Sequence, residues 1–243
     1  MLLSPGEISK RLERILPTVT KPGRYVGGEY NQIVKDWENI GVHVALAFPD
    51  IYDIGVPNLG IAILYDTINQ RSDCLAERVY LPWLDMEEAL RQHQIPLFSL
   101  ETKHALADFD IIGVTLPYET LYTNFLNLLD MAQIPLHTSE RLKHHPLIIA
   151  GGHSAYNPEP MADFVDAFVI GEGEDIIHEI IDRYHSWKAT GEDRNLLLKK
   201  IAQIPGVYVP SFYEASYNPD GTLAATTPLD ASIHKTVTKR IVG

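Results

Sequence analysis

The sequence predicts an α/β protein built around a Rossmann-like, doubly wound parallel sheet. From Val42 onward, short apolar runs alternate with segments of helical periodicity, and the connections between them are short. The runs are apolar throughout rather than at every second residue, which is typical of strands buried on both faces. With 243 residues, 45% of them hydrophobic, the chain is long enough to bury a substantial core.

The repeating pattern gives five strands, each followed by a helix. The expected strands are residues 42–48, 78–83, 111–116, 146–150 and 167–171. The expected helices are residues 58–70, 85–94, 119–133, 158–165 and 174–191. Asp85 is the expected N-cap of the second helix, and Gly191 is expected to end the fifth.

The N-terminal 40 residues do not follow this pattern. Ser4, Pro5 and Glu7 have the spacing of a capping box with proline at the first helical position, which predicts a helix through about Leu16. The residues after it, PTVTKPGRYVGGEYN, are irregular. We therefore expect an N-terminal extension over residues 1–40.

The C-terminal part also departs from the pattern. Residues 207–223 predict two short strands that turn at Pro219-Asp220-Gly221. We expect the sheet domain to span residues 41–190, and residues 191–243 to contain a helix, a small hairpin and a linker toward a separate catalytic domain.

Composition excludes several classes of function. The net charge is −12 and no basic block occurs, so nucleic acid is not an expected partner. No apolar run approaches the roughly 18–20 residues of a membrane span, and the N-terminus lacks a signal peptide, so we expect a cytoplasmic protein without a membrane partner. Cys74 is the one cysteine, so this chain cannot form an internal disulfide or hold a zinc or iron–sulfur site by itself.

Ligands of open parallel sheets bind at the carboxyl ends of the strands. The turns that matter are therefore PDIYDIGVPNLG, TLPYET, AGGHSAYNPEP and GEGED. No phosphate-binding loop of the P-loop or dinucleotide type is present, and the GEGED turn carries acids where a pyrophosphate needs backbone amides.

Glycines and tyrosines in these turns are the candidate ligand contacts. Gly151, Gly152, Gly171 and Gly173 lack a Cβ, so a bound molecule can approach the backbone closely. The phenols of Tyr52, Tyr118 and Tyr156 offer an apolar face and a polar tip, which suits a large planar cofactor.

The acidic residues of the GEGED turn have a simpler interpretation. Glu172, Glu174 and Asp175 precede a helix, where carboxylates cap free amides and interact favourably with the helix dipole. Glu174 and His178 are four residues apart and could also hold a metal, but a capping or solvent-facing pair is the commoner arrangement.

The stretches DFDIIGVTLPYETLYTNFLNLLD and PLIIAGGHSAYNPEPMADFVDAFVIGEGEDIIHEI resemble the cobalamin-binding domain that precedes the catalytic barrel in cobalamin-dependent radical SAM proteins. GRYVGGEYN and FPDIYDIGVPNLGIAIL are similar to one uncharacterised bacterial subgroup of them. The resemblance runs from about Gly23 to Tyr184.

The resemblance implies where the cofactor would lie. The nucleotide tail of cobalamin would enter between strand ends, lined by Gly151–Gly152 and Gly171–Gly173 with Thr115 alongside, and Asn58 and Gly60 would lie near the corrin. Glu172 and Glu174 alternate with Gly171 and Gly173 and belong to the same side of this site. Other cobalamin carriers have D-x-H-x-x-G after the first strand, whose histidine ligates cobalt, whereas here Tyr52 stands in that place beside Asp53, so no histidine ligation is expected.

A second departure concerns catalysis. Radical SAM chemistry needs three closely spaced cysteines for an iron–sulfur cluster, so S-adenosylmethionine and the cluster are expected only in a downstream catalytic domain, in cis or supplied by a partner. The leading hypothesis is thus a non-catalytic, cobalamin-binding module. Two alternatives stay open: a ligand-free Rossmann-like domain that docks on the barrel, and a nucleotide-dependent enzyme with Glu174 or Asp53 as base.

Overall fold

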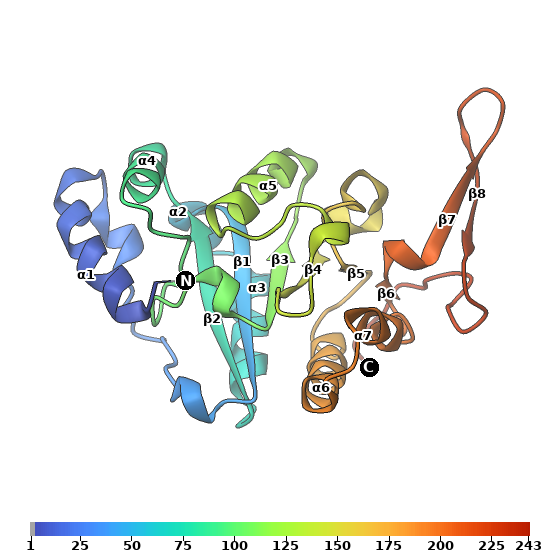
Figure 1. Ribbon diagram of the computed structural model, residues 1–243, viewed down its shortest axis with the longest axis horizontal. Coiled ribbons are helices and arrows are strands. Elements are labelled where there is room, and N and C mark those ends of the chain that lie inside the picture. Colours follow the sequence, from blue (N-terminus) through green and yellow to red (C-terminus); the bar gives the residue numbers. More distant parts are fainter. Residues whose placement is uncertain (1–2) are drawn as a thin grey trace.

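The computed structural model describes residues 3–243 and has a six-stranded sheet at its centre (Figure 1). The strand order is β2-β1-β3-β4-β5-β6, in which β1 to β5 pair in parallel and β6 pairs antiparallel with β5. The strands are β1 (Val42–Ile51), β2 (Cys74–Leu81), β3 (Ile111–Thr115), β4 (Leu147–Gly151), β5 (Ala167–Val169) and β6 (Val207–Tyr208). This confirms the predicted α/β, Rossmann-like class.

The connecting helices cover both faces of the sheet. They are α2 (Tyr52–Gly55), α3 (Leu59–Asn69), α4 (Leu84–Gln92), α5 (Tyr122–Met131), α6 (Ile176–Thr190) and α7 (Arg194–Ile201). The chain moves from β1 to β2 in one direction and from β2 through β5 in the other, so right-handed crossovers place α3 opposite α4 and α5. Figure 1 shows α4 and α5 on the upper side of the sheet and α3 and α6 on the lower side.

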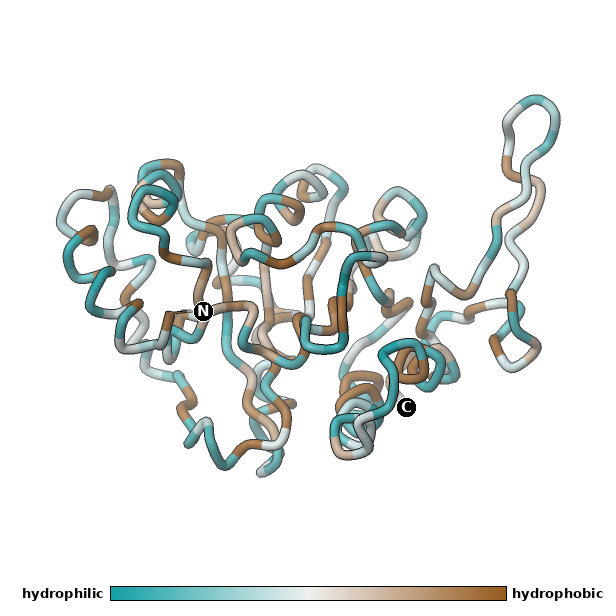
Figure 2. Tube along the Cα trace, in the orientation of Figure 1, coloured by the Kyte–Doolittle hydropathy of each residue, from teal (hydrophilic) through white to brown (hydrophobic). Residues whose placement is uncertain are grey.

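Apolar side chains fill both layers between sheet and helices. Phe48, Phe125 and Phe168 are among the largest fully buried side chains. Hydrophobic residues are concentrated along the central strands in Figure 2, whereas the outer turns are hydrophilic. Within residues 3–243, no helix is long and apolar enough to cross a membrane.

Several boundaries differ from the sequence prediction. β2 begins at Cys74 rather than residue 78, and Cys74 is buried there, where desolvation raises the pKa of its thiol to about 12. Residues 158–165 form only a 3₁₀ turn over Glu159–Met161. Asp85 is not the N-cap of α4, because the helix begins one residue earlier at Leu84 with Trp83 as its N-cap, and the Asp85 carboxylate accepts a hydrogen bond from the Thr20 amide (2.6 Å).

Val207 and Tyr208 were predicted as part of the C-terminal hairpin but form the edge strand β6 of the main sheet. The hairpin itself is β7 (Tyr213–Tyr217) paired with β8 (Leu223–Pro228), and it projects away from the body of the molecule (Figure 1). The division into residues 1–40, 41–190 and 191–243 stays a prediction.

The N-terminal extension packs on the α4 side and along β2. Its helix α1 (Pro5–Ile15) has the predicted capping box, in which the Ser4 hydroxyl accepts from the Glu7 amide and the Glu7 carboxylate accepts from the Ser4 amide. A further contact of the extension is made by Trp37, whose ring stacks between the imidazoles of His43 and His104, with ring centroids 3.8 and 3.5 Å away.

The stacked histidine predicts a pH dependence of stability. Burial, and secondarily the nearby His43, lower the pKa of His104 to about 4 from 6.5. Between these values His104 binds a proton in the unfolded chain but not in the folded chain. The contribution of neutral His104 to the free energy of unfolding is therefore complete above about pH 6.5 and is lost progressively as the pH falls toward 4. Urea unfolding at pH 7 and pH 5 should therefore show a larger loss for the wild type than for His104→Gln. Equal losses in the two proteins would contradict this assignment.

Candidate functional site

A groove of about 240 Å³ lies at the carboxyl ends of the central strands, on the face that carries α3 and α6. It is beside the point where the strand order reverses between β1 and β3, which is the usual ligand site of a doubly wound sheet. Its lining comes from β1, α3, β3, β4, β5 and the turn before α6; the residues are Leu46, Gly60, Leu64, Gly113, Val114, Thr115, Ile149, Gly151, Gly152, Val169, Gly171, Glu172, Gly173, Glu174 and Ile177.

Strand register explains the floor of the groove. Leu46, Gly113 and Ile149 are paired across β1, β3 and β4, and Thr115 is paired with Gly151 two residues further along the strands. Because alternate residues of a strand face the same side, Gly113 and Thr115 share this face. Both are only half-buried, whereas Ile112 before Gly113 and Val114 between Gly113 and Thr115 are buried. The absence of a side chain at Gly113 and Gly151 thus hollows an otherwise filled layer.

The four predicted glycines of the strand ends differ in what surrounds them. A Cβ on Gly151 would meet no atom within 4 Å, and one on Gly173 would only touch Leu64 at 3.6 Å. A Cβ on Gly152 would overlap the backbone of Leu116, 2.7 Å from its oxygen, and one on Gly171 would overlap Arg240, 2.7 Å from its nitrogen. Gly151 therefore leaves space for a ligand, while Gly152 and Gly171 leave space for the protein's own backbone.

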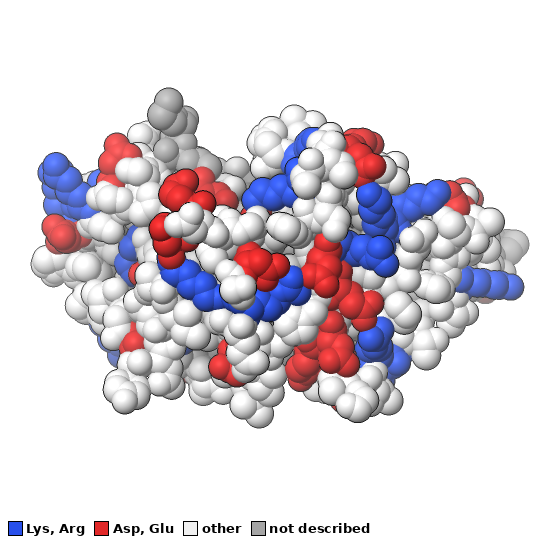
Figure 3. Space-filling view, turned by 90° about the horizontal axis from the view of Figure 1, so that it is seen from below, with Lys and Arg blue, Asp and Glu red and all other residues white. Residues whose placement is uncertain are grey.

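The walls of the groove are apolar and its lip is acidic. Leu64 of α3 and Ile177 of α6 face the floor, and the hydroxyl of Thr115 makes no hydrogen bond with residues 3–243. The lip carries the carboxylates of Glu172 and Glu174. Figure 3 views this face and shows acidic side chains gathered near its middle, with basic side chains to either side. An apolar slot with one free hydroxyl and an acidic rim suits a largely neutral, flat group better than a free phosphate.

Tyr52 and Asp53 do not line this groove. The Tyr52 hydroxyl donates to the carboxylate of Glu29, and this hydrogen bond, together with burial, raises the pKa of the phenol to about 12. Asp53 forms ion pairs with Arg24 (2.5 Å) and Lys21 (3.1 Å), which hold its pKa at about 2. Both side chains therefore fasten the N-terminal extension to the turn after β1.

Asn58 and Tyr118 are also outside the groove. The Asn58 side chain caps α3 by accepting a hydrogen bond from the Ile61 amide (3.0 Å). Tyr118 lies in the turn after β3 and is exposed. Asp175 occupies the N-cap position of α6 as expected, but its side chain makes no capping hydrogen bond.

Sequence reasoning missed the residues in the interior of the groove. Gly113, Leu64 and Ile177 lie within a strand or helix rather than in a turn, and we considered only the turns. One signal was available, because a glycine inside a β-branched run such as IIGVT often marks a close approach of another group. Leu64 and Ile177 have no comparable signal, since each looks like an ordinary core residue of its helix.

A comparison with protein families identifies the chain. The family model described as radical SAM proteins, N-terminal, matches residues 60–210. The chain belongs to this radical SAM N-terminal family. The matched region runs from the second residue of α3 to the second residue after β6 and contains nearly all of the groove lining.

One curated relative is an uncharacterized protein of Methanocaldococcus jannaschii. It is 23% identical over 189 residues, covering 72% of this chain and 36% of the relative. The aligned part of this chain therefore spans about a third of the length of the curated relative it matches.

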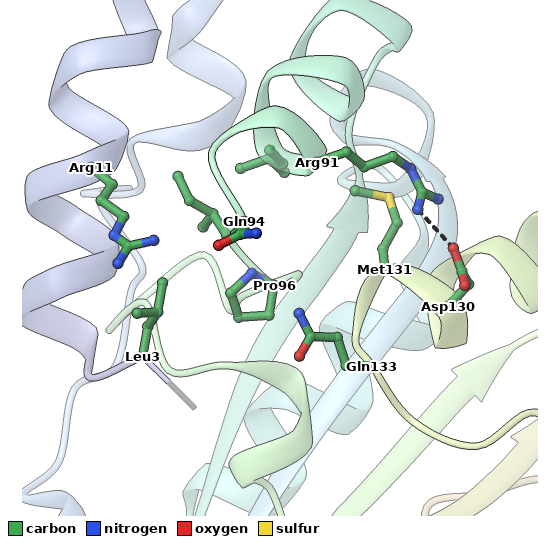
Figure 4. Close-up of a pocket in the computed structure, with 10 residues that line it drawn as sticks. Leu3, Arg11, Arg91, Gln94, Pro96, Asp130, Met131 and Gln133 are labelled. Atoms are coloured by element: carbon green, nitrogen blue, oxygen red, sulfur yellow. Dashed lines mark hydrogen bonds and ion pairs between the residues drawn. The ribbon is translucent and has the colours of Figure 1, made fainter. Parts of the chain in front are cut away.

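A second cavity of about 520 Å³ lies between α1 and the C-terminal ends of α4 and α5 (Figure 4). Its cations are engaged within the domain: Arg91 pairs with Asp130 (2.8 Å), and Arg11 donates to the carbonyl of His93 (3.0 Å). It contains none of the predicted contacts. Over residues 3–243, no group of three or more His, Cys, Asp and Glu side chains is arranged to hold a metal ion.

Proposed function

We propose that this radical SAM N-terminal domain binds the nucleotide tail of a cobalamin in the groove and carries the cofactor beside a radical SAM catalytic domain. The observation that carries the proposal is the hollow over Gly113 and Gly151, where a Cβ on Gly151 would meet nothing within 4 Å. A flat aromatic base could lie on this glycine floor between Leu64 and Ile177, with Thr115 as its hydrogen-bonding group.

The charges around the groove support a particular mode of binding. Glu172 and Glu174 disfavour a buried phosphate, so the base anchors the tail and the phosphodiester stays in solvent. When bound, cobalamin supplies a cobalt centre for alkyl-transfer or radical chemistry. The residues of this chain bind and orient that cofactor.

The turn after β1 supplies no cobalt ligand in this proposal. The Tyr52 phenol donates a hydrogen bond to the Glu29 carboxylate, which raises its pKa to about 12, so the protonated phenol is a poor metal ligand at neutral pH. Asp53, with a pKa of about 2, is likewise a weak base, which argues against Asp53 as the base of the nucleotide-dependent enzyme.

The edge of the sheet around the groove favours the second candidate, docking on the catalytic domain. The turns after β1, β2, β3 and β4 expose large apolar side chains, namely Ile54, Leu59, Trp83, Leu84, Tyr118 and Tyr156. We propose that the radical SAM catalytic domain docks on this edge of the sheet. Docking at this edge is compatible with cofactor binding. It would be the sole function of the domain if the groove held no ligand.

Substituting Gly151 tests the cobalamin proposal. Gly151→Val places a branched side chain in the hollow without backbone strain, so we expect hydroxocobalamin affinity to fall at least about 100-fold while thermal stability stays within a few degrees of the wild type. The measurement is a titration of purified chain followed by corrin absorbance and co-elution. Gly23→Val, at another open glycine that does not line the groove, is the matched control. If the wild type shows neither a spectral change nor co-elution, the docking function is favoured instead.

A further inference from the structure

Residues 239–242 lie along the turn that closes one end of the groove. The Arg240 amide donates to the carbonyl of Ile170 (3.0 Å), and the Glu172 amide donates to the carbonyl of Arg240 (3.1 Å). Arg240 thereby forms a parallel bridge with Gly171. The segment extends the sheet beside the end of β5, just past the point where Gly206 accepts from the Ile170 amide (2.7 Å).

Side chains of the turn before α6 and of α6 itself also hold this segment. The guanidinium of Arg240 pairs with Glu179 of α6 (2.7 Å), and the Val242 amide donates to the carboxylate of Glu172 (2.6 Å). Glu172 lines the groove, and α6 supplies the wall residue Ile177. The same turn and helix therefore form the groove wall and bind residues 239–242.

The fit between the segment and the turn is close. Gly171 has φ +119° and Gly206 has φ +89°, and a Cβ on either residue would overlap Arg240. These two glycines are thus required by the segment. Without it, Gly171 and Gly173 would leave the turn with few restraints, because the amide of Glu172 would lose its acceptor.

We propose that residues 239–242 act as a latch that regulates the groove: when docked, they hold residues 170–174 in the shape that binds a ligand. By linkage, a ligand that contacts this turn strengthens docking of the latch by the same factor. The nature of the ligand rests on the proposed function, whereas the coupling between latch and turn does not.

Hydrogen exchange on the ligand-free chain tests the coupling directly. We expect Arg240→Ala to speed exchange of the Glu172 amide and its neighbours in residues 170–174 by about fivefold or more, because the ion pair to Glu179 and the fixed carbonyl at residue 240 are lost. Glu179→Gln should act in the same direction. Lys235→Ala removes the same charge from an exposed residue outside residues 239–242 and should leave this exchange unchanged. Equal exchange in Arg240→Ala and Lys235→Ala would overturn the proposal.

Hydroxocobalamin provides the second arm of the experiment. We expect it to slow exchange of residues 239–242 in the wild type and to bind Arg240→Ala about fivefold more weakly. Unchanged affinity in a variant whose latch is released would overturn the regulation. If the wild type binds no cobalamin, the proposed ligand is wrong, and the exchange of the ligand-free variants still decides whether the latch shapes the turn.

Discussion

Replacing Asp166 with alanine should lower the free energy of unfolding by about 3–5 kcal/mol. Its buried carboxylate lies between two buried guanidinium groups and accepts from Arg141 (3.2 Å), Arg194 (2.9 Å) and the Ile148 amide (2.8 Å). Removing it leaves two buried cations without their shared counter-charge and one amide of β4 without an acceptor, so each of these groups loses a partner that offsets the cost of burying it.

Urea unfolding followed by circular dichroism, with the variant and the wild type measured at the same pH, would determine this loss of stability. The control is Asp182→Ala, because Asp182 also pairs with an arginine, Arg71 (2.6 Å), but its side chain is 63% exposed. We expect Asp182→Ala to lower the free energy of unfolding by less than about 1 kcal/mol. A small effect at Asp166, similar to that of the control, would show that the carbonyl groups around Arg141 and Arg194 are sufficient to hold both cations.

Gly152→Ala should cost about 2–5 kcal/mol of stability, while Gly151→Ala should change it by less than about 1 kcal/mol. Gly152 has φ +103° and ψ −178°, a conformation that only glycine adopts readily, and its added Cβ would lie 2.9 Å from the carbonyl carbon of Leu116. Gly151 has neither restriction. The stability of the two variants is measured by thermal or urea unfolding, which compares two glycines that are adjacent in the sequence.

This pair of variants separates two roles that look identical in the sequence. If Gly151→Ala were as destabilising as Gly152→Ala, the space above Gly151 would be needed for packing, and the groove would not be an open site. The proposed cobalamin slot depends on the opposite result.

The alternation of apolar runs and helical periods was sufficient to predict the class of fold, because strands buried on both faces must be apolar throughout. The edge strand β6 was not predictable in this way, since two residues carry no periodicity and their pairing with Phe168 and Val169 depends on the path of α7. Similarly, Cys74 starts β2 because the register with Val42 continues that far, and no local signal marks this.

The candidate site likewise contains features that the sequence predicts and features that it does not. The turns that carry Gly60, Thr115, Gly151, Gly171 and Glu174 meet at one groove, as the rule for carboxyl ends of parallel strands predicts. Tyr52 and Asp53 follow the same rule along the chain, yet their side chains contact residues 21–29. No local pattern reveals that contact, because the two segments are brought together only by the folded extension.

The sequence by itself determined the layered architecture and the edge of the sheet where a ligand would bind, since both follow from local periodicity and the chirality of the connections. Only the tertiary structure decided which glycines face empty space and which face backbone. Gly151 and Gly171 each follow an apolar run in the sequence, but Leu116 and Arg240, distant along the chain, determine what surrounds the turns. Space at a residue depends on every segment packed around it, and that information is not local.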